Sequence, residues 1–187
     1  MRKQCLPKEG KLQKAIASYQ QAQKLDPNVD LDPETETLEQ DLEAVMRTWT
    51  PVLIQKGENL AREGEIEKAI AKYQEAQELD PTVKITADSW NNVCWFGSLH
   101  RQAAKVLEAC KNAVALASET EKGMFRDSRG VARVMTGNTQ DAIEDFQAFI
   151  ESTDSDNNKK QRQGWIKDLQ AGKNPFTEEE IERLLEE

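Results

Sequence analysis

The three cysteines are the residues of this chain most able to do chemistry, and they stand at Cys5, Cys94 and Cys110. Their number is odd, they are widely spaced, and none belongs to a Cys-x-x-Cys or Cys/His ligand pattern. This spacing encodes neither a disulfide framework nor a zinc site. We therefore expect reduced thiols, mostly buried, with Cys5 as the most exposed.

No other residues form a catalytic pattern. The single histidine, His100, has no His or Cys partner close in sequence, which favours a turn residue over a functional one. Adjacent carboxylates at Glu178, Glu179 and Glu180 would point in different directions on a helix and form a solvated face. Glycine patterns that bind phosphates or dinucleotides do not occur. We expect a protein that is not an enzyme and uses no cofactor or metal.

The charge and composition of the 187 residues exclude further classes of protein. There are 25 Lys and Arg against 34 Asp and Glu, a net charge of −9, and 37% of the residues are hydrophobic. No stretch approaches the roughly 20 apolar residues that span a membrane, and an acidic chain repels a phosphate backbone. We expect no nucleic acid or membrane partner. The N-terminal residues lack the apolar stretch of a secretory signal, so the expected location is cytoplasmic.

An internal repeat determines the architecture. Residues 9–27 and residues 63–81 align without a gap at an offset of 54, with 13 identities in 19 positions. Within each copy, small and aromatic residues recur at helical spacing between charged residues. A glycine begins each copy and an Asp-Pro ends it, as in a helix-turn-helix unit. The pattern predicts stacked helix pairs.

These features resemble the tetratricopeptide repeat family, whose second helix carries a small residue, an aromatic residue and a second small residue and is followed by a proline. The matching residues in the second copy are Ala69, Tyr73, Ala76 and Pro81. Gly57 matches the close-packing glycine of the preceding helix. The first copy repeats it with Ala15, Tyr19, Ala22 and Pro27, and a later unit matches with Gly130, Gly137, Ala142 and Phe146. A more divergent unit has Cys94 where glycine stands and Cys110 where the aromatic stands, which places both thiols in the core.

The resemblance implies an all-α, right-handed superhelix of helical hairpins forming a single domain over residues 1–187. The units are a first repeat at 9–27 with a truncated first helix, an acidic insert at 28–50, a second repeat at 51–81, a divergent third repeat at 87–118, a fourth repeat at 123–154, and C-terminal capping helices at 159–187.

The acidic insert is the main departure from the family. It carries eight acidic residues and no Lys or Arg between Leu25 and Met46, and apolar residues at three-or-four spacing predict an amphipathic helix over about 34–49 that runs into Pro51. The arrangement is similar to the extended repeat modules near the C-termini of large bacterial, notably cyanobacterial, signalling proteins.

In the family, the first helices of successive units line a concave groove that receives a partner peptide or helix. The matching positions here are Gln55, Glu58, Arg62, Asn91, Asn92, Trp95 and Asp127, together with Val131 and Val134. Paired Asn side chains could bind a peptide backbone, and Trp95 offers apolar surface. The alternative reading places the tryptophans in the core. Because Glu58 and Asp127 stand where the family's carboxylate clamp wants neutral or basic groups, we expect a basic or mixed amphipathic ligand and not an acidic C-terminal peptide.

The expected function is therefore a non-catalytic scaffold for protein–protein interaction, within a larger signalling protein. The alternative is a homodimer that assembles through the uncapped first repeat and the insert helix. Its residues would be Leu12, Ile16, Tyr19, Leu38 and Leu42.

Overall fold

A computed structural model describes residues 21, 24–25 and 38–186 of the chain, and in this part every regular element is an α-helix. The all-α prediction is confirmed. By contrast with the single domain expected from the sequence, the chain divides into two compact units: Met1–Leu53 with Glu75–Val83, and Ile54–Gln74 with Lys84–Glu187.

The first described helix, α2 (Leu38–Arg62), runs without a break through Pro51. The sequence prediction of a separate insert helix ending before Pro51 is therefore wrong. Proline lacks one N–H and prefers a helix end, but the backbone on either side of it still forms helix when the flanking residues favour it. The insert and the first helix of the second repeat are one element.

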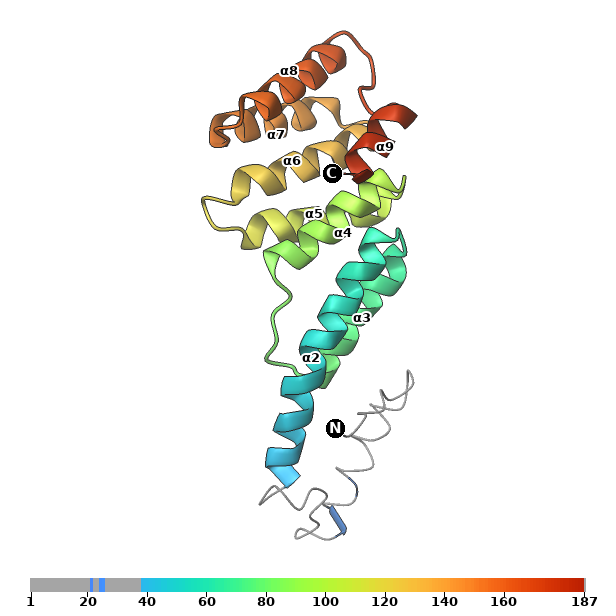
Figure 1. The fold of residues 1–187 in the computed structure, drawn as a ribbon, viewed down its shortest axis with the longest axis vertical. Coiled ribbons are helices and arrows are strands. Elements are labelled where there is room, and N and C mark those ends of the chain that lie inside the picture. Colours follow the sequence, from blue (N-terminus) through green and yellow to red (C-terminus); the bar gives the residue numbers. More distant parts are fainter. Residues whose placement is uncertain (1–20, 22–23, 26–37, 187) are drawn as a thin grey trace. The chain divides into compact units, whose positions relative to one another are not determined.

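The second unit contains a succession of helix pairs (Figure 1). Each helix packs against the next from α4 to α8, and α4 also packs directly against α6. The helices that follow α2 are α3 (Ile66–Leu79), α4 (Ala87–Leu99), α5 (Ala103–Leu116), α6 (Lys122–Met135), α7 (Thr139–Ser152), α8 (Asp156–Gln170) and α9 (Glu178–Glu186). This is the helical-hairpin architecture that the repeats predict.

One turn ends the first helix of every pair. After α2, α6 and α8 a glycine adopts positive φ, at Gly64 (79°), Gly137 (83°) and Gly172 (74°), and after α4 the same place is taken by Arg101 (62°). In each turn this residue and the next donate backbone hydrogen bonds to the last turn of the helix, in the two-bond pattern of a Schellman motif. Arg101 is therefore an L-residue in a conformation that its Cβ disfavours.

The paired helices touch at positions 16 residues apart. A Cβ on Gly57 would lie 2.5 Å from Cε1 of Tyr73, and one on Gly130 would lie 2.7 Å from Cε1 of Phe146. Both rings are fully buried. Glycine is required at these positions because the ring of the second helix occupies the space of a side chain.

In the third repeat a disulfide bond replaces this contact. Cys94 and Cys110 are also 16 residues apart, their Cα atoms are 4.8 Å apart, and their sulfurs are bonded. The expectation of reduced thiols is therefore wrong for this pair, while their predicted burial is correct. The two positions meet because the hairpin brings them face to face, which permits the bond. The disulfide also weakens the expectation of a cytoplasmic location, since such bonds are rare in the cytosol.

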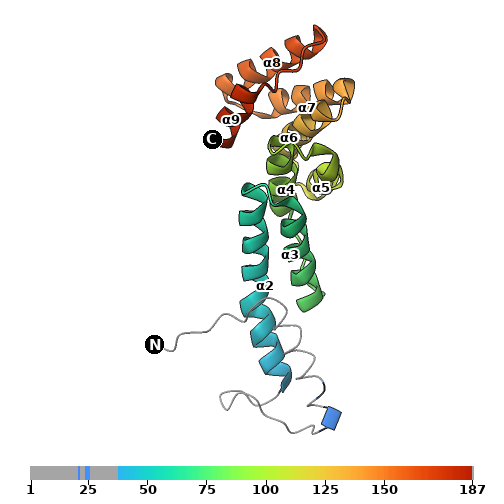
Figure 2. The same ribbon diagram turned by 90° about the vertical axis from the view of Figure 1, so that its right-hand side faces the viewer.

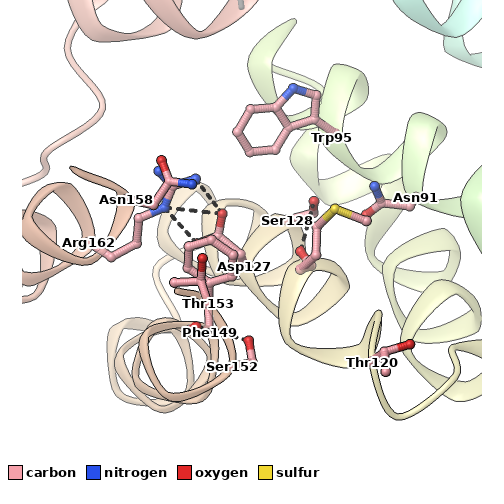
Figure 3. A pocket seen from close by; sticks show the side chains of 11 residues that line it. Asn91, Trp95, Thr120, Asp127, Ser128, Phe149, Ser152, Thr153, Asn158 and Arg162 are labelled. Carbon is pink, nitrogen blue, oxygen red and sulfur yellow. Dashed lines mark hydrogen bonds and ion pairs between the residues drawn. The ribbon is translucent and has the colours of Figure 1, made fainter. Parts of the chain in front are cut away.

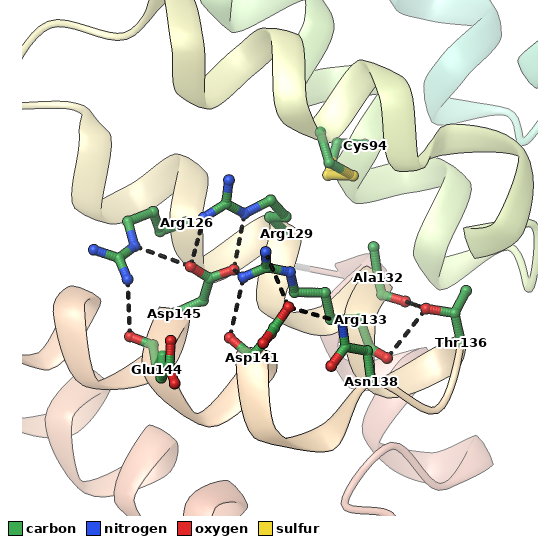
Figure 4. Close-up of polar contacts among 11 residues, drawn as sticks. Cys94, Arg126, Arg129, Ala132, Arg133, Thr136, Asn138, Asp141, Glu144 and Asp145 are labelled. Carbon is green, nitrogen blue, oxygen red and sulfur yellow. Dashed lines mark hydrogen bonds and ion pairs between the residues drawn. A yellow bond between two sulfur atoms is a disulfide. The ribbon is translucent and has the colours of Figure 1, made fainter.

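A buried carboxylate ties α6 to α7. Asp145 is fully buried and accepts hydrogen bonds from Arg126, Arg129 and Arg133, which stand along one side of α6 (Figure 4). Such charge-assisted bonds satisfy the oxygens of a group that would otherwise be costly to bury. The sequence analysis did not select this cluster.

Replacing Arg101 with glycine should stabilise the protein, because glycine removes the strain of a side chain at positive φ. We expect Arg101→Gly to raise the free energy of unfolding by up to about 1 kcal/mol. The converse change, Gly137→Ala, should lower it by about 1 kcal/mol, since no atom lies within 4 Å of the added Cβ and only the backbone penalty remains. Urea denaturation followed by circular dichroism measures both. If Arg101→Gly destabilised the protein, the side chain at this positive φ would not be a source of strain.

Removing the disulfide should destabilise the second unit. The disulfide joins residues 16 positions apart and so closes a short loop. Loss of the bond should lower the free energy of unfolding by about 3 kcal/mol. We expect the double variant Cys94→Ala/Cys110→Ala to unfold at lower urea concentration than Cys5→Ala, the control that removes the other thiol. Thiol titration of the unreduced, denatured wild type should find one free cysteine; three would show that the bond is absent.

Candidate functional site

The first helices of the pairs present equivalent positions in rows. Equivalent residues of α4 and α6 are 36 positions apart in the sequence, and equivalent residues of α6 and α8 are 35 positions apart. One set, the pocket row, is Asn91, Asp127 and Arg162. The next two sets, the middle row and the end row, are Trp95, Val131 and Ile166, and Ser98, Val134 and Leu169. Together we call these three rows the groove face.

The pocket row lines a cavity of about 480 Å³ (Figure 3). Its walls come from α4, α6, α7 and α8 and the loops beside them. Three of the predicted groove residues, Asn91, Trp95 and Asp127, meet here. The others are Thr120, Met124, Ser128, Phe149, Ser152, Thr153, Asn158 and Arg162. The lining therefore combines large apolar side chains with amides and hydroxyls, as ligand sites commonly do.

A buried ion pair forms one wall of the cavity. Arg162 donates from Nε to Oδ1 of Asp127 at 3.0 Å and from Nη2 to Oδ2 at 2.6 Å. Its guanidinium also lies over the rings of Phe149 and Trp165, with centroids 4.9 Å and 4.5 Å away. Burial raises the pKa of Asp127, and the hydrogen bonds and charge of the paired guanidinium oppose part of that rise.

This pair changes the charge argument made from the sequence. Asp127 was expected to confront a ligand with an unpaired negative charge. Arg162, the equivalent residue of the following helix, cancels that charge. Repulsion by Asp127 therefore gives no reason to exclude an acidic ligand.

Asn91, which lines the same cavity, has a side-chain carbonyl oxygen without a hydrogen-bond partner. Its Oδ1 atom is buried and receives no hydrogen bond from the described residues. An unsatisfied buried carbonyl costs free energy that a donor on a ligand would recover. Met124, opposite on α6, is 47% exposed and adds uncovered apolar surface.

The remaining predicted groove residues do not line this cavity. Glu58 on α2 accepts a hydrogen bond from Oγ of Ser89 at 2.9 Å and one from Gln55 at 3.2 Å. The guanidinium of Arg62 lies over the ring of Phe96, 5.5 Å from its centroid. These side chains connect α2 to α4. Asn92 is half-buried and lies outside the lining.

His100 fills the turn role that the sequence predicts. Its Nε2 lies 3.0 Å from the carbonyl oxygen of Arg62, and because a carbonyl only accepts, Nε2 donates. Gln102 donates similarly to the carbonyl of Gly64 at 2.7 Å. Both residues hold the end of α2 against the turn after α4.

Five of the six residues of the middle and end rows are buried, and the sixth, Trp95, is half-buried and lines the open cavity. Val131 and Val134, which the sequence analysis placed in an open groove, are buried in one apolar cluster with Ile166, Leu169 and two residues of α9, Ile181 and Leu184. The helix α9 also packs against α4. The sequence predicted a C-terminal helix but not that it would cover this face, because an amphipathic pattern does not identify the surface it meets.

The sequence analysis assigned self-association to five residues near the beginning of the chain. Leu12, Ile16 and Tyr19 lie outside the described residues, and so do the side chains of Leu38 and Leu42, although their backbone belongs to α2.

Across residues 38–186, no helix is both long and apolar enough to cross a membrane. Among the same residues, no group of His, Cys, Asp and Glu side chains is arranged to hold a metal ion.

Comparison with known proteins agrees with the helix-pair geometry. The model of the tetratricopeptide repeat family matches residues 4–29 and residues 50–83. No curated protein and no solved structure matches the chain. The second match contains Gly57, Gly64 and Tyr73, whose roles recur in the two following helix pairs. The chain therefore contains tetratricopeptide repeats.

Proposed function

We propose that this protein is a non-catalytic scaffold that binds a segment of a partner protein in the cavity lined by the pocket row. Tetratricopeptide repeats generally mediate protein–protein interaction. The observation that carries the proposal is the juxtaposition of Asn91 and Trp95 in one open cavity with Met124 and Phe149.

The lining suggests the chemistry of the bound segment. Trp95, Met124 and Phe149 favour a large apolar side chain, which would exclude water from these surfaces. The free Oδ1 of Asn91 favours a backbone N–H beside that side chain. The Asp127–Arg162 pair is internally neutral, so it selects against neither sign of charge. The partner is thus recognised by an apolar anchor and its adjoining peptide group.

The sequence resemblance to repeat modules of bacterial, notably cyanobacterial, signalling proteins supports a place within a larger signalling assembly. In such a setting the partner segment would be a linker or a helix of another component. Homodimerisation through the first repeat is the alternative role.

A matched pair of asparagine variants tests the cavity. Peptides selected from a random 12-residue phage library on the wild type would be synthesised and titrated by fluorescence polarisation. We expect Trp95→Ala to weaken binding at least tenfold, about 1.4 kcal/mol, and Asn91→Ala to weaken it several-fold. Asn92→Ala is the control, because Asn92 is adjacent and half-buried but does not line the cavity.

Equal losses for the two asparagine variants, or unchanged binding by Trp95→Ala, would contradict this site. Circular dichroism should show unchanged helix content in all three variants. Light scattering during size exclusion, over a hundredfold range of concentration, tests the alternative: a concentration-independent monomer rules out homodimerisation as the function.

A further inference from the structure

We propose that α9 is a built-in ligand of the groove face, and that the rows it covers bind a partner's amphipathic helix of the same pattern when α9 is displaced. This inference rests on the proposed function, because it names a second part of the binding surface and the kind of partner that fits it. It also makes the C-terminal helix an autoinhibitory element.

The apolar side of α9 is buried in the cluster that contains middle-row and end-row residues of the groove face. Ile181 is 6% and Leu184 is 2% exposed, while Leu185 beside them is 37% exposed. The buried pair belongs to the same cluster as the middle-row and end-row residues Val131, Val134, Ile166 and Leu169. These rows are apolar in α6 and α8, and in α4 they contain Trp95 and Ser98. The face and the helix are complementary where they meet.

A polar contact fixes the register of α9. Glu180 accepts a hydrogen bond from the indole Nε1 of Trp165 at 3.0 Å and from Nε2 of Gln161 at 3.2 Å. Although burial alone would raise the pKa of Glu180, hydrogen bonds from Arg183, Trp165 and Gln161 lower it. A helix that binds this face should therefore carry the pattern of Glu180, Ile181 and Leu184. In this pattern an apolar residue directly follows a Glu, and a second apolar residue stands three positions after the first.

The connection to α8 suits a detachable element. After α8 the chain turns and leads to α9 (Figure 2). The turn contains Gly172, and residues 171–174 are exposed before Phe176 enters the cluster. Thr177 caps α9 by accepting from the N–H of Glu180 at 3.2 Å. A helix of 9 residues is too short to be stable in water by itself. It should be helical on the face and unfolded when released, so a partner helix competes with it.

The covered rows adjoin the open cavity. Trp95 lines the cavity and also packs against the apolar cluster that contains Ile181 and Leu184. Displacing α9 would therefore extend the cavity into a continuous surface along α4, α6 and α8. A partner with an apolar anchor for the cavity and a helix for the covered rows would use both.

The probe is a fluorescein-labelled synthetic peptide of residues 173–187, titrated against the full-length chain. We expect weak binding to the wild type, because α9 in the same chain occupies the site at high effective concentration. Leu184→Glu should release α9 and strengthen binding of the probe at least tenfold. Leu185→Glu is the matched control, since it makes the same change one residue along on the exposed side, and its binding should equal that of the wild type.

A milder variant keeps the test independent of misfolding. Glu180→Ala removes the contact with Trp165 and Gln161 without placing a charge in the core, and it should strengthen binding of the probe several-fold. Hydrogen exchange should show loss of protection confined to residues 176–186 in both Leu184→Glu and Glu180→Ala. A probe that itself carries Leu184→Glu should not bind.

Equal probe binding by the wild type, Leu184→Glu and Glu180→Ala would overturn the proposal. So would loss of protection throughout α4–α8 in both variants, which would make α9 an inseparable part of the core. The library peptides of the proposed function give a separate answer. If they bind the wild type through Trp95 while the probe binds no variant, the cavity function stands and this inference fails; the reverse result leaves this inference and removes the cavity function.

Discussion

Close contact within the pairs α2–α3, α4–α5 and α6–α7, at positions 16 residues apart, is the constraint on which the rest of the second unit depends. Glycine opposite a ring at Gly57 and Tyr73, or at Gly130 and Phe146, allows one helix to lie directly on the other. At Cys94 a covalent bond makes the equivalent contact. The left-handed turn after each first helix then reverses the chain in the same way each time. Identical pairs stack regularly, and regular stacking aligns equivalent residues of α4, α6 and α8.

That alignment builds the groove face from residues far apart in the sequence. The same position supplies an amide in α4, a carboxylate in α6 and a guanidinium in α8, at Asn91, Asp127 and Arg162. Because neighbouring helices place these groups side by side, the two charges pair with each other and Oδ1 of the amide is left without a partner among the described residues. The repeats share one backbone arrangement and differ in the side chains at equivalent positions. Those side-chain differences therefore set the binding chemistry of this chain.

The acidic helix α9 shows how net charge and local contacts compare in this chain. By its net charge of −9 alone, the chain would repel an acidic helix. Nevertheless α9, with Glu178, Glu179 and Glu180 in its first turn, lies on the groove face. Its contacts there are apolar side chains and the neutral donors of Trp165 and Gln161. Local desolvation and hydrogen bonding outweigh the net charge, which acts weakly at long range in salt.

The sequence by itself determined the helical class, the repeats and the glycines, because these depend on local periodicity and backbone preference. It also contained the signal for the disulfide: Cys94 and Cys110 occupy the two positions that touch in the neighbouring pairs, a stronger indicator than cysteine count. Tertiary structure alone decided that Arg162 neutralises Asp127, that α2 continues through Pro51, and that α9 is buried in the same apolar cluster as Val131 and Val134. These outcomes depend on which surfaces meet across many residues, and an amphipathic pattern specifies an apolar side without specifying its partner.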